Sequence, residues 1–243
     1  MGEIIAMEMW GDEAAQETVR EECAFSPAHY RHVLEAAQAA GYYLLGFAEF
    51  LNRKPDRFLL LRHDVDVSLD YAVAMAEMEG ELGARATYFV RIHAEGYSPL
   101  SRAGRTALRH LIALGHEVAL QHEVGFFPAD GQTPAEQLRG EIRVLEGATG
   151  VPVLGVARHM PKWGEELPSR DVLGASGMLY AAGDEVFNEG ALFLSDASRR
   201  WKGGCPCRFI GGWPKIYLLT HPIWWLNEDA NVVIINELLR EGR

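Results

Sequence analysis

The chain has 243 residues, of which 48% are apolar, 23% charged and 10% aromatic. These proportions exclude a disordered, collagen-like or low-complexity protein. The formal net charge is −11 at pH 7 and the sequence has no basic cluster, so we expect neither nucleic acid nor an anionic membrane as a partner.

The first 25 residues are acidic and lack a basic stretch followed by a long apolar core. We interpret residues 1–25 as an appended segment before a single domain at 26–243. No apolar run reaches the roughly 20 residues of a membrane span. The three cysteines are too few for a disulfide scaffold, and their odd number favours a reducing compartment, so we expect a cytoplasmic protein. Cys205-Pro-Cys207 has the spacing of a soft-metal site, but no second cysteine pair lies nearby, and we interpret both residues as loop thiols.

Capping residues predict four amphipathic helices. The N-terminal caps are Ser26, Ser68, Thr106 and Thr133, and the helices are expected to end at Gly41, Gly83, Gly115 and about Gly147. Two of these caps carry a second signal. Pro27 follows Ser26 at the first helical position, and Glu136 completes a capping box with Thr133.

Short apolar or β-branched runs separate these helices. They are FLLLR from Phe58, ATYFV from Ala86, HEVAL from His116, VPVLGVA from Val151, and then MLYAA, ALFLS and IYLLT. The alternation with helices predicts parallel strands joined by βα crossovers. Seven such runs favour the α/β class and a single irregular (β/α) barrel of about seven strands over an open sheet.

Polar side chains collect where the predicted strands end. The strand from Phe58 runs directly into Arg62-His63-Asp64-Val65-Asp66, in which Arg62, Asp64 and Asp66 share a face because strand side chains repeat every two residues. Neighbouring carboxylates repel one another unless a cation lies between them or one is protonated. The sequence therefore favours a cation or a shared proton at this strand end.

Other predicted strands also end in titratable or polar side chains, namely Gln121-His122-Glu123, Arg158-His159, Asp196 with Trp201, and His221. The carboxyl ends of parallel strands lie at one rim of a barrel, so these groups are expected to converge there as metal ligands and acid–base groups. His116 begins its strand and is expected at the opposite, structural end. Residue 120 is Leu, which excludes a His-Glu-x-x-His zinc helix.

With these segments in order, the chain resembles the polysaccharide deacetylase family, the carbohydrate esterases with the NodB homology fold. HDVD at 63–66 is similar to the motif that supplies a catalytic base and a metal ligand, which the resemblance assigns to Asp64 and Asp66. GHEVALQHE at 115–123 resembles the motif that leads to a metal-binding histidine, here His122. LTH at 219–221 resembles the motif of the general acid, here His221.

The resemblance implies further roles. ARHMP at 157–161 stands where the family has an arginine that orients the base, here Arg158. SDASRRW at 195–201 is similar to the motif that shapes the substrate groove, which implies substrate-binding roles for Asp196 and Trp201. Trp224 and Trp225 are further candidates for stacking on a sugar ring.

One position departs from the family pattern. The family has a second metal-binding histidine four residues after the first, and this chain has Phe126 there. We therefore expect the third ligand to be His159, with Glu123 as the second choice.

The resemblance implies a metal-dependent hydrolase that removes an N-acetyl group from a sugar, or cleaves a related non-peptide C–N amide bond. Its cofactor would be a divalent metal, zinc first, with cobalt, nickel or manganese as alternatives. The expected substrate is an N-acetylated sugar that is free or linked to a lipid or nucleotide.

Two alternative functions stay open. Phe126 favours a non-catalytic carbohydrate-binding relative with a degenerate metal site. Asp64 and Asp66 also fit an Asp-x-Asp glycosyltransferase, although the strand-end histidines would then have no role and no glycine-rich phosphate loop is present.

Overall fold

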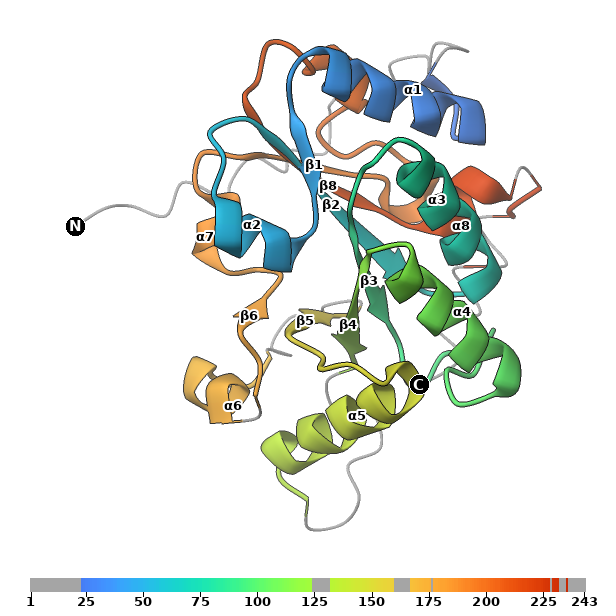
Figure 1. Cartoon of the computed structure of the whole chain (residues 1–243), viewed down its shortest axis with the longest axis vertical. Coiled ribbons are helices and arrows are strands. Elements are labelled where there is room, and N and C mark those ends of the chain that lie inside the picture. The colour runs from blue at the N-terminus through green and yellow to red at the C-terminus, as the bar shows by residue number, and fades with distance from the viewer. Residues whose placement is uncertain are drawn as a thin grey trace.

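The computed structural model describes residues 23–123, 132–159, 167–175, 177–227, 229–231 and 235. Helices and strands alternate along most of the chain (Figure 1). The strands are β1 Tyr43–Leu45, β2 Phe58–Val65, β3 Thr87–Val90, β4 Glu117–His122, β5 Gly155–Arg158, β6 Tyr180–Ala181, β7 Leu192–Ser195 and β8 Lys215–Thr220. The helices are α1 Pro27–Ala39, α2 Phe47–Arg53, α3 Leu69–Glu81, α4 Arg102–Ala113, α5 Pro134–Thr149, α6 Arg170–Ala175, α7 Glu185–Asn188 and α8 Pro222–Leu226, with two 3-10 turns, η2 Ala197–Arg199 and η3 Pro206–Arg208.

The strands form one parallel sheet in the order β6-β5-β4-β3-β2-β8-β7, and β1 pairs with the first residues of β2. The terminal strands β6 and β7 are not paired with each other within the described residues, so the sheet is a half-barrel rather than a closed ring. This architecture confirms the predicted α/β class and irregular (β/α) barrel. Strand β1 is an addition that the sequence patterns did not predict.

Helices α1, α3, α4 and α5 lie along one side of the curled sheet, and α2 and α7 lie on the other (Figure 1). The larger apolar core fills the space under the first group, where outward strand residues such as Leu59, Leu61 and Leu120 are buried. A smaller, mainly aromatic cluster fills the inner side, where Phe47 and Phe187 have ring centroids 4.5 Å apart. The inner cluster fills the half-barrel beneath the carboxyl ends of the strands. Polar side chains lie at those carboxyl ends.

Most predicted helix borders are confirmed. The hydroxyls of Ser26 and Ser68 accept hydrogen bonds from the first turns of α1 and α3, and Thr133 and Glu136 form the predicted capping box. Helix α4 is different, because Ser101 rather than Thr106 caps it. The Ser101 hydroxyl accepts a hydrogen bond from the Gly104 N–H, so the helix begins a turn earlier than predicted.

Two other borders differ from the prediction. Helix α5 continues through Gly147 to Thr149, and Gly150 ends it with a φ of 82°. Strand β5 begins only at Gly155, where the ring of Tyr180 on β6 lies so close that an added Cβ would be 1.9 Å from it. The sheet needs glycine there because the neighbouring strand's side chain occupies that space.

Of the predicted appended segment at 1–25, only the last three residues belong to the described part of the chain. The ring of Phe25 stacks on that of Trp201, with centroids 5.1 Å apart. None of the helices in the described ranges has both the length and the apolar character needed to cross a bilayer.

Candidate active site

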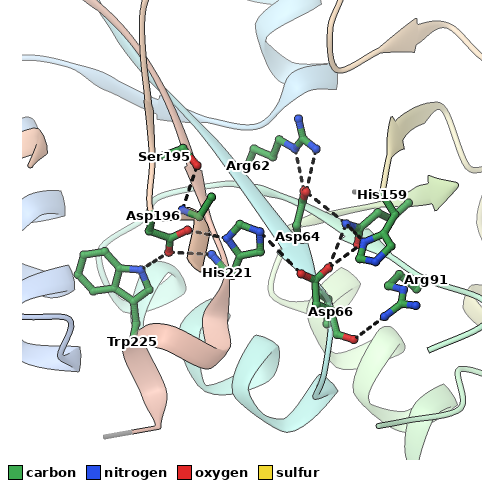
Figure 2. Close-up of polar contacts among 12 residues, drawn as sticks. Arg62, Asp64, Asp66, Arg91, His159, Ser195, Asp196, His221 and Trp225 are labelled. Carbon is green, nitrogen blue, oxygen red and sulfur yellow. Dashed lines mark hydrogen bonds and ion pairs between the residues drawn. The ribbon is translucent and has the colours of Figure 1, made fainter. Parts of the chain in front are cut away.

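Asp64 is held by an arginine on its own strand. Arg62 Nε lies 2.7 Å from Asp64 Oδ1 and Arg62 Nη2 lies 2.8 Å from Asp64 Oδ2, which is a bidentate ion pair in a buried setting (Figure 2). Burial lowers the pKa of Arg62, but Asp64 and Tyr217 together raise it above its usual value, so the guanidinium stays charged. Leu60 belongs to the inner cluster, and the two-residue strand period places Arg62 and Asp64 on that same face.

Arg158 was predicted to orient Asp64, and this is wrong in the structure. Its neighbour Ala157 packs into the inner cluster, so Arg158 on β5 points to the other face of the sheet. Arg62 performs the orientation instead. The alternation that placed Arg62 and Asp64 on one face was visible in the sequence, but their direct pairing was not predicted.

Asp66 lies at the centre of the polar cluster, just beyond the end of β2. Its Oδ1 is 3.0 Å from Gln121 Nε2 and 3.3 Å from His159 Nδ1, and its Oδ2 is 3.7 Å from His221 Nε2. Arg91 donates a hydrogen bond to the Asp66 backbone carbonyl at 3.1 Å (Figure 2). Burial raises the pKa of Asp66, but the hydrogen bond from His159 and the charges of His159, His221 and Arg91 lower it well below its usual range. Asp66 is therefore a carboxylate at neutral pH.

Gln121, rather than His122, faces Asp66. The amide nitrogen of Gln121 is 3.2 Å from Asp64 Oδ2 and 3.0 Å from His159 Nδ1, so this side chain joins three predicted site residues. His122 points to the opposite face of β4, where its Nδ1 donates to Glu141 of α5 at 2.7 Å. The predicted pairing of His122 with Asp66 is wrong in this geometry, because successive side chains of a strand point to opposite faces. Phe126, the other residue of that motif, lies outside the described residues.

Donor atoms for a divalent cation lie beside Asp66. Gln121 Oε1, Glu123 Oε2 and His159 Nε2 are buried without a hydrogen-bond partner in the described part of the chain. His159 Nε2 is 3.9 Å from Glu123 Oε1, and Glu123 also pairs with Arg91. Oxygen and imidazole donors suit zinc or a similar divalent ion, and buried polar atoms without partners are costly unless a ligand satisfies them. Asp66 and His159 with Glu123 or Gln121 are therefore the residues that would hold a cation here, although the ligand atoms of Asp66, His159 and Glu123 do not all lie within 4.8 Å of one another.

His221 is oriented by Asp196. His221 Nδ1 lies 2.5 Å from Asp196 Oδ1, and the other carboxylate oxygen accepts from the His221 backbone N–H at 2.9 Å and from Trp225 Nε1 at 2.8 Å (Figure 2). Burial lowers the pKa of His221, but the carboxylates of Asp196, Asp66 and Asp64 together outweigh it, with Asp196 the largest of the three, and raise the pKa to about 9. The imidazole is therefore protonated at neutral pH, with Nε2 facing Asp66.

Three of the four predicted substrate-binding residues are buried. Asp196 is 0% exposed, and Trp224 and Trp225 are 2% and 0% exposed, because the β7–β8 connection and α8 fold into the core, and this burial contradicts a role in binding a sugar. Trp201 is partly buried between Phe25 and Trp225, and its binding role stays a prediction.

The structure thus brings together five of the predicted residues, Asp64, Asp66, Glu123, His159 and His221, and adds Arg62, Arg91 and Gln121 around them. Two of the added residues carried a signal in the sequence. Arg62 precedes Asp64 by one strand period, and Gln121 lies in the polar run that ends β4. Arg91 directly follows β3 and carried no comparable signal.

No family model matches the sequence, and no curated protein matches it in sequence either. Solved structures do match the fold. The deacetylase domain of BpsB from Bordetella bronchiseptica has a TM-score of 0.50 and 13% sequence identity over 90% of this chain and 91% of that one. The Streptococcus pyogenes deacetylase PplD, solved in complex with acetate, has a TM-score of 0.46 and 12% identity, with coverage of 95% and 93%.

A CE4 family pseudoenzyme from Bacillus anthracis matches at a TM-score of 0.48 and 14% identity over 83% of this chain. This chain covers only 62% of that protein's length. The similarity to the Bordetella domain shows that the chain has the NodB-like (β/α) fold expected from the sequence.

Proposed function

We propose that this protein is a hydrolase that cleaves the amide bond of an N-acylated sugar, with an N-acetyl group as the first candidate. One observation carries the proposal. A carboxylate fixed by an arginine, Asp64, and a protonated imidazole fixed by a carboxylate, His221, lie in one cluster around Asp66 at the carboxyl ends of parallel strands. This is the combination of base and acid that amide hydrolysis requires.

Asp64 is suited to accept a proton from the attacking water. Arg62 donates one hydrogen bond to each of its carboxylate oxygens, and Gln121 donates a second one to Oδ2, so the further acceptor position lies on Oδ1. The bidentate pair fixes the direction of this position, so proton transfer to Asp64 does not require the side chain to move.

His221 is suited to protonate the leaving amine. Its Nδ1–H is committed to Asp196, so the proton on Nε2 is the one available to a substrate. A pKa of about 9 keeps this proton in place at neutral pH and still permits its transfer to the leaving nitrogen, which becomes a much stronger base as the C–N bond breaks.

Asp66 and His159, with Glu123 or the carbonyl oxygen of Gln121, would hold a divalent cation, zinc first and cobalt, nickel or manganese as alternatives. Such an ion polarises an amide carbonyl and lowers the pKa of a bound water. The lowered pKa of Asp66 keeps that side chain in the ligand form, and Arg91 fixes it through its backbone carbonyl.

A second function has one observation in its favour. The Gln121 amide nitrogen is hydrogen-bonded to both Asp64 and Asp66, so a neutral donor already joins the two carboxylates. This arrangement fits a carbohydrate-binding protein that retains the fold without catalysis. In either case the ligand that we propose is an N-acetylated sugar, free or linked to a lipid or nucleotide, and the cytoplasmic location stays a prediction.

The test measures acetate released from a panel of N-acetylated sugars by purified protein supplied with zinc or cobalt. We expect release by the wild type, loss of release in Asp64→Asn, and unchanged release in Asp56→Asn, a matched change of an exposed aspartate before β2. Melting temperatures of both variants establish that they are folded. Sugar binding without any release, unaltered by Asp64→Asn, would instead support the binding protein.

A further inference from the structure

A second cluster of ligand-type side chains lies outside the acid–base cluster. One donor atom each of Cys23, His29 and Cys205 lie within 4.8 Å of one another. A fourth side chain, Cys207, joins them, since its Sγ is 3.3 Å from His29 Nε2. Cys23 comes just before α1, His29 lies in α1, and Cys205 and Cys207 flank Pro206 at η3. The cluster therefore joins segments that are more than 170 residues apart in sequence.

The sulfur–nitrogen distances are those of a metal site. Tetrahedral zinc has Zn–S bonds of about 2.3 Å and Zn–N bonds of about 2.0 Å, which place a sulfur and a nitrogen of the same site about 3.5 Å apart. His29 Nε2 is 3.3 Å from Cys207 Sγ and 3.5 Å from Cys205 Sγ. One imidazole nitrogen thus faces two sulfurs at the separation that a shared ion imposes.

The second nitrogen of His29 is held as in metal sites. Its Nδ1 lies 2.8 Å from the backbone carbonyl of Ala24 and donates to it, which leaves the Nε2 lone pair directed at the sulfurs. Metal-bound histidines almost always donate their other ring N–H to a carbonyl or carboxylate, because this fixes the tautomer and the ring orientation. His29 and Cys205 are each 5% exposed, and Cys23 and Cys207 are partly buried.

The backbone before Cys205 makes a turn that places Cys205 and Cys207 next to α1. Gly203 and Gly204 have φ values of 87° and 103°, which residues with a side chain rarely adopt. An added Cβ at Gly203 would lie 2.9 Å from the side chain of Leu194 on β7. The turn is therefore pressed against the sheet edge, which fixes where Cys205 and Cys207 emerge.

We propose that Cys23, His29, Cys205 and Cys207 bind one structural zinc ion in a Cys3His site. This replaces the interpretation of Cys205 and Cys207 as loop thiols, which the sequence favoured because the partners of this pair are remote along the chain. The site differs from the one beside Asp66 in its donors, which are mainly sulfur rather than oxygen. It does not depend on the proposed hydrolase function.

The zinc site has a consequence for the fold. It fastens the segment before α1 to the long β7–β8 connection, two elements that share no strand pairing. The His29 ring also packs on Trp225, with centroids 5.6 Å apart, and Trp225 donates to Asp196. Loss of the ion is therefore expected to lower the melting temperature and to loosen the support of Asp196.

The test uses the reduced full-length protein with cobalt(II) in place of zinc. Thiolate ligands give tetrahedral cobalt a charge-transfer band in the near ultraviolet that oxygen and imidazole ligands do not give. We expect this band in the wild type at two equivalents of cobalt, enough for both proposed sites, its displacement by zinc, and its strong reduction in Cys205→Ser.

Two matched controls separate this site from others. His32→Ala removes an exposed histidine from the same helix, and Asp66→Asn removes the central ligand of the other proposed site. Both are expected to retain the band. Thiol titration gives a second readout, in which zinc protects the cysteines from alkylation and a chelator exposes all three.

Some results would overturn the zinc site. They are cobalt uptake by the reduced wild type without a thiolate band, cysteines that react equally fast with and without zinc, or loss of the band in Asp66→Asn. A Cys205–Cys207 or Cys23–Cys205 disulfide that forms in protein purified under reducing conditions, detected by mass spectrometry, would also overturn it. The wild-type spectrum alone decides the question if Cys205→Ser does not fold.

Discussion

The Nδ1 atom of His221 lies 2.5 Å from a carboxylate oxygen of Asp196, and that carboxylate is completely buried. Both oxygens of Asp196 are used, because Trp225 and the His221 backbone donate to the second one. Asp196 thus orients His221 and has no exposed surface of its own. The pair fixes the direction and the charge of the imidazole before any substrate arrives.

Replacing the carboxylate of Asp196 is expected to change the pH dependence of hydrolysis. Against the effect of burial, Asp196 makes the largest contribution, with Asp66 and Asp64, to a His221 pKa of about 9, so wild-type kcat/KM should fall as the pH rises through about 9 and His221 loses its proton. Asp196→Asn removes this charge, so the alkaline limb should move to lower pH. A pH profile of kcat/KM checks this, with Glu189→Gln, an exposed acidic residue, as the control.

The same pair should make folding stability depend on pH. His221 has a raised pKa in the folded protein, so its protonation stabilises the fold fully below the unfolded pKa of about 6.5, and this stabilisation is lost as the pH rises through about 9. The difference in unfolding free energy between wild type and Asp196→Asn should therefore be larger at pH 6 than at pH 10. An equal difference at both pH values would show that the charge of Asp196 does not act through His221.

Arg62 and Arg158 should differ sharply in their effect on catalysis. Arg62→Lys removes the bidentate hold on Asp64, and a misplaced base typically lowers the rate about 10²-fold. Arg158→Lys changes a side chain on the other face of β5 and should leave kcat unchanged. Steady-state kinetics of the two variants decide which arginine orients the base. A loss of kcat in Arg158→Lys alone would reverse the assignment made from the structure.

Substitutions of Gln121 and His122 test which of the two residues lies at the proposed metal site. Gln121→His places an imidazole beside Asp66 and His159, and we expect zinc affinity to rise at least about tenfold. His122→Gln should leave zinc affinity unchanged and destabilise the fold by about 1–3 kcal/mol, since it disturbs the buried bond to Glu141. Competitive zinc titration and urea unfolding measure the two quantities. Reduced zinc affinity in His122→Gln would restore that residue as a ligand.

Trp225 should prove to be a core residue. Trp225→Phe removes the indole N–H that donates to the buried Asp196, and we expect a loss of about 1–3 kcal/mol in unfolding free energy, with the volume change adding to it. Trp213→Phe changes a tryptophan that is 46% exposed and should have little effect. Urea unfolding of both variants makes the comparison. If Trp225→Phe weakened sugar binding without loss of stability, the residue would have to be exposed to ligand in solution.

The sequence alone determined the features that depend on neighbouring residues. Alternation of apolar runs with capped helices predicted a parallel α/β sheet, and the hydroxyl caps at Ser26, Ser68 and Thr133 predicted three helix starts. The two-residue period of a strand placed Arg62 and Asp64 on one face. These predictions were correct because capping and pleating act over a few residues, and no distant contact is needed to decide them.

Only the tertiary structure decided which face of each strand looks into the half-barrel. Leu60 and Ala119 pack into the inner cluster, so Asp64 and Gln121 point to the site, whereas His122 points outward to α5. Gln121 and His122 are consecutive residues of β4, so they point to opposite faces of the strand. Which of the two faces the half-barrel depends on packing between β4, α5 and the inner aromatic side chains. The partners of Asp196, Trp225 and the three cysteines come from chain segments remote in sequence, and only the folded arrangement brings them within bonding distance.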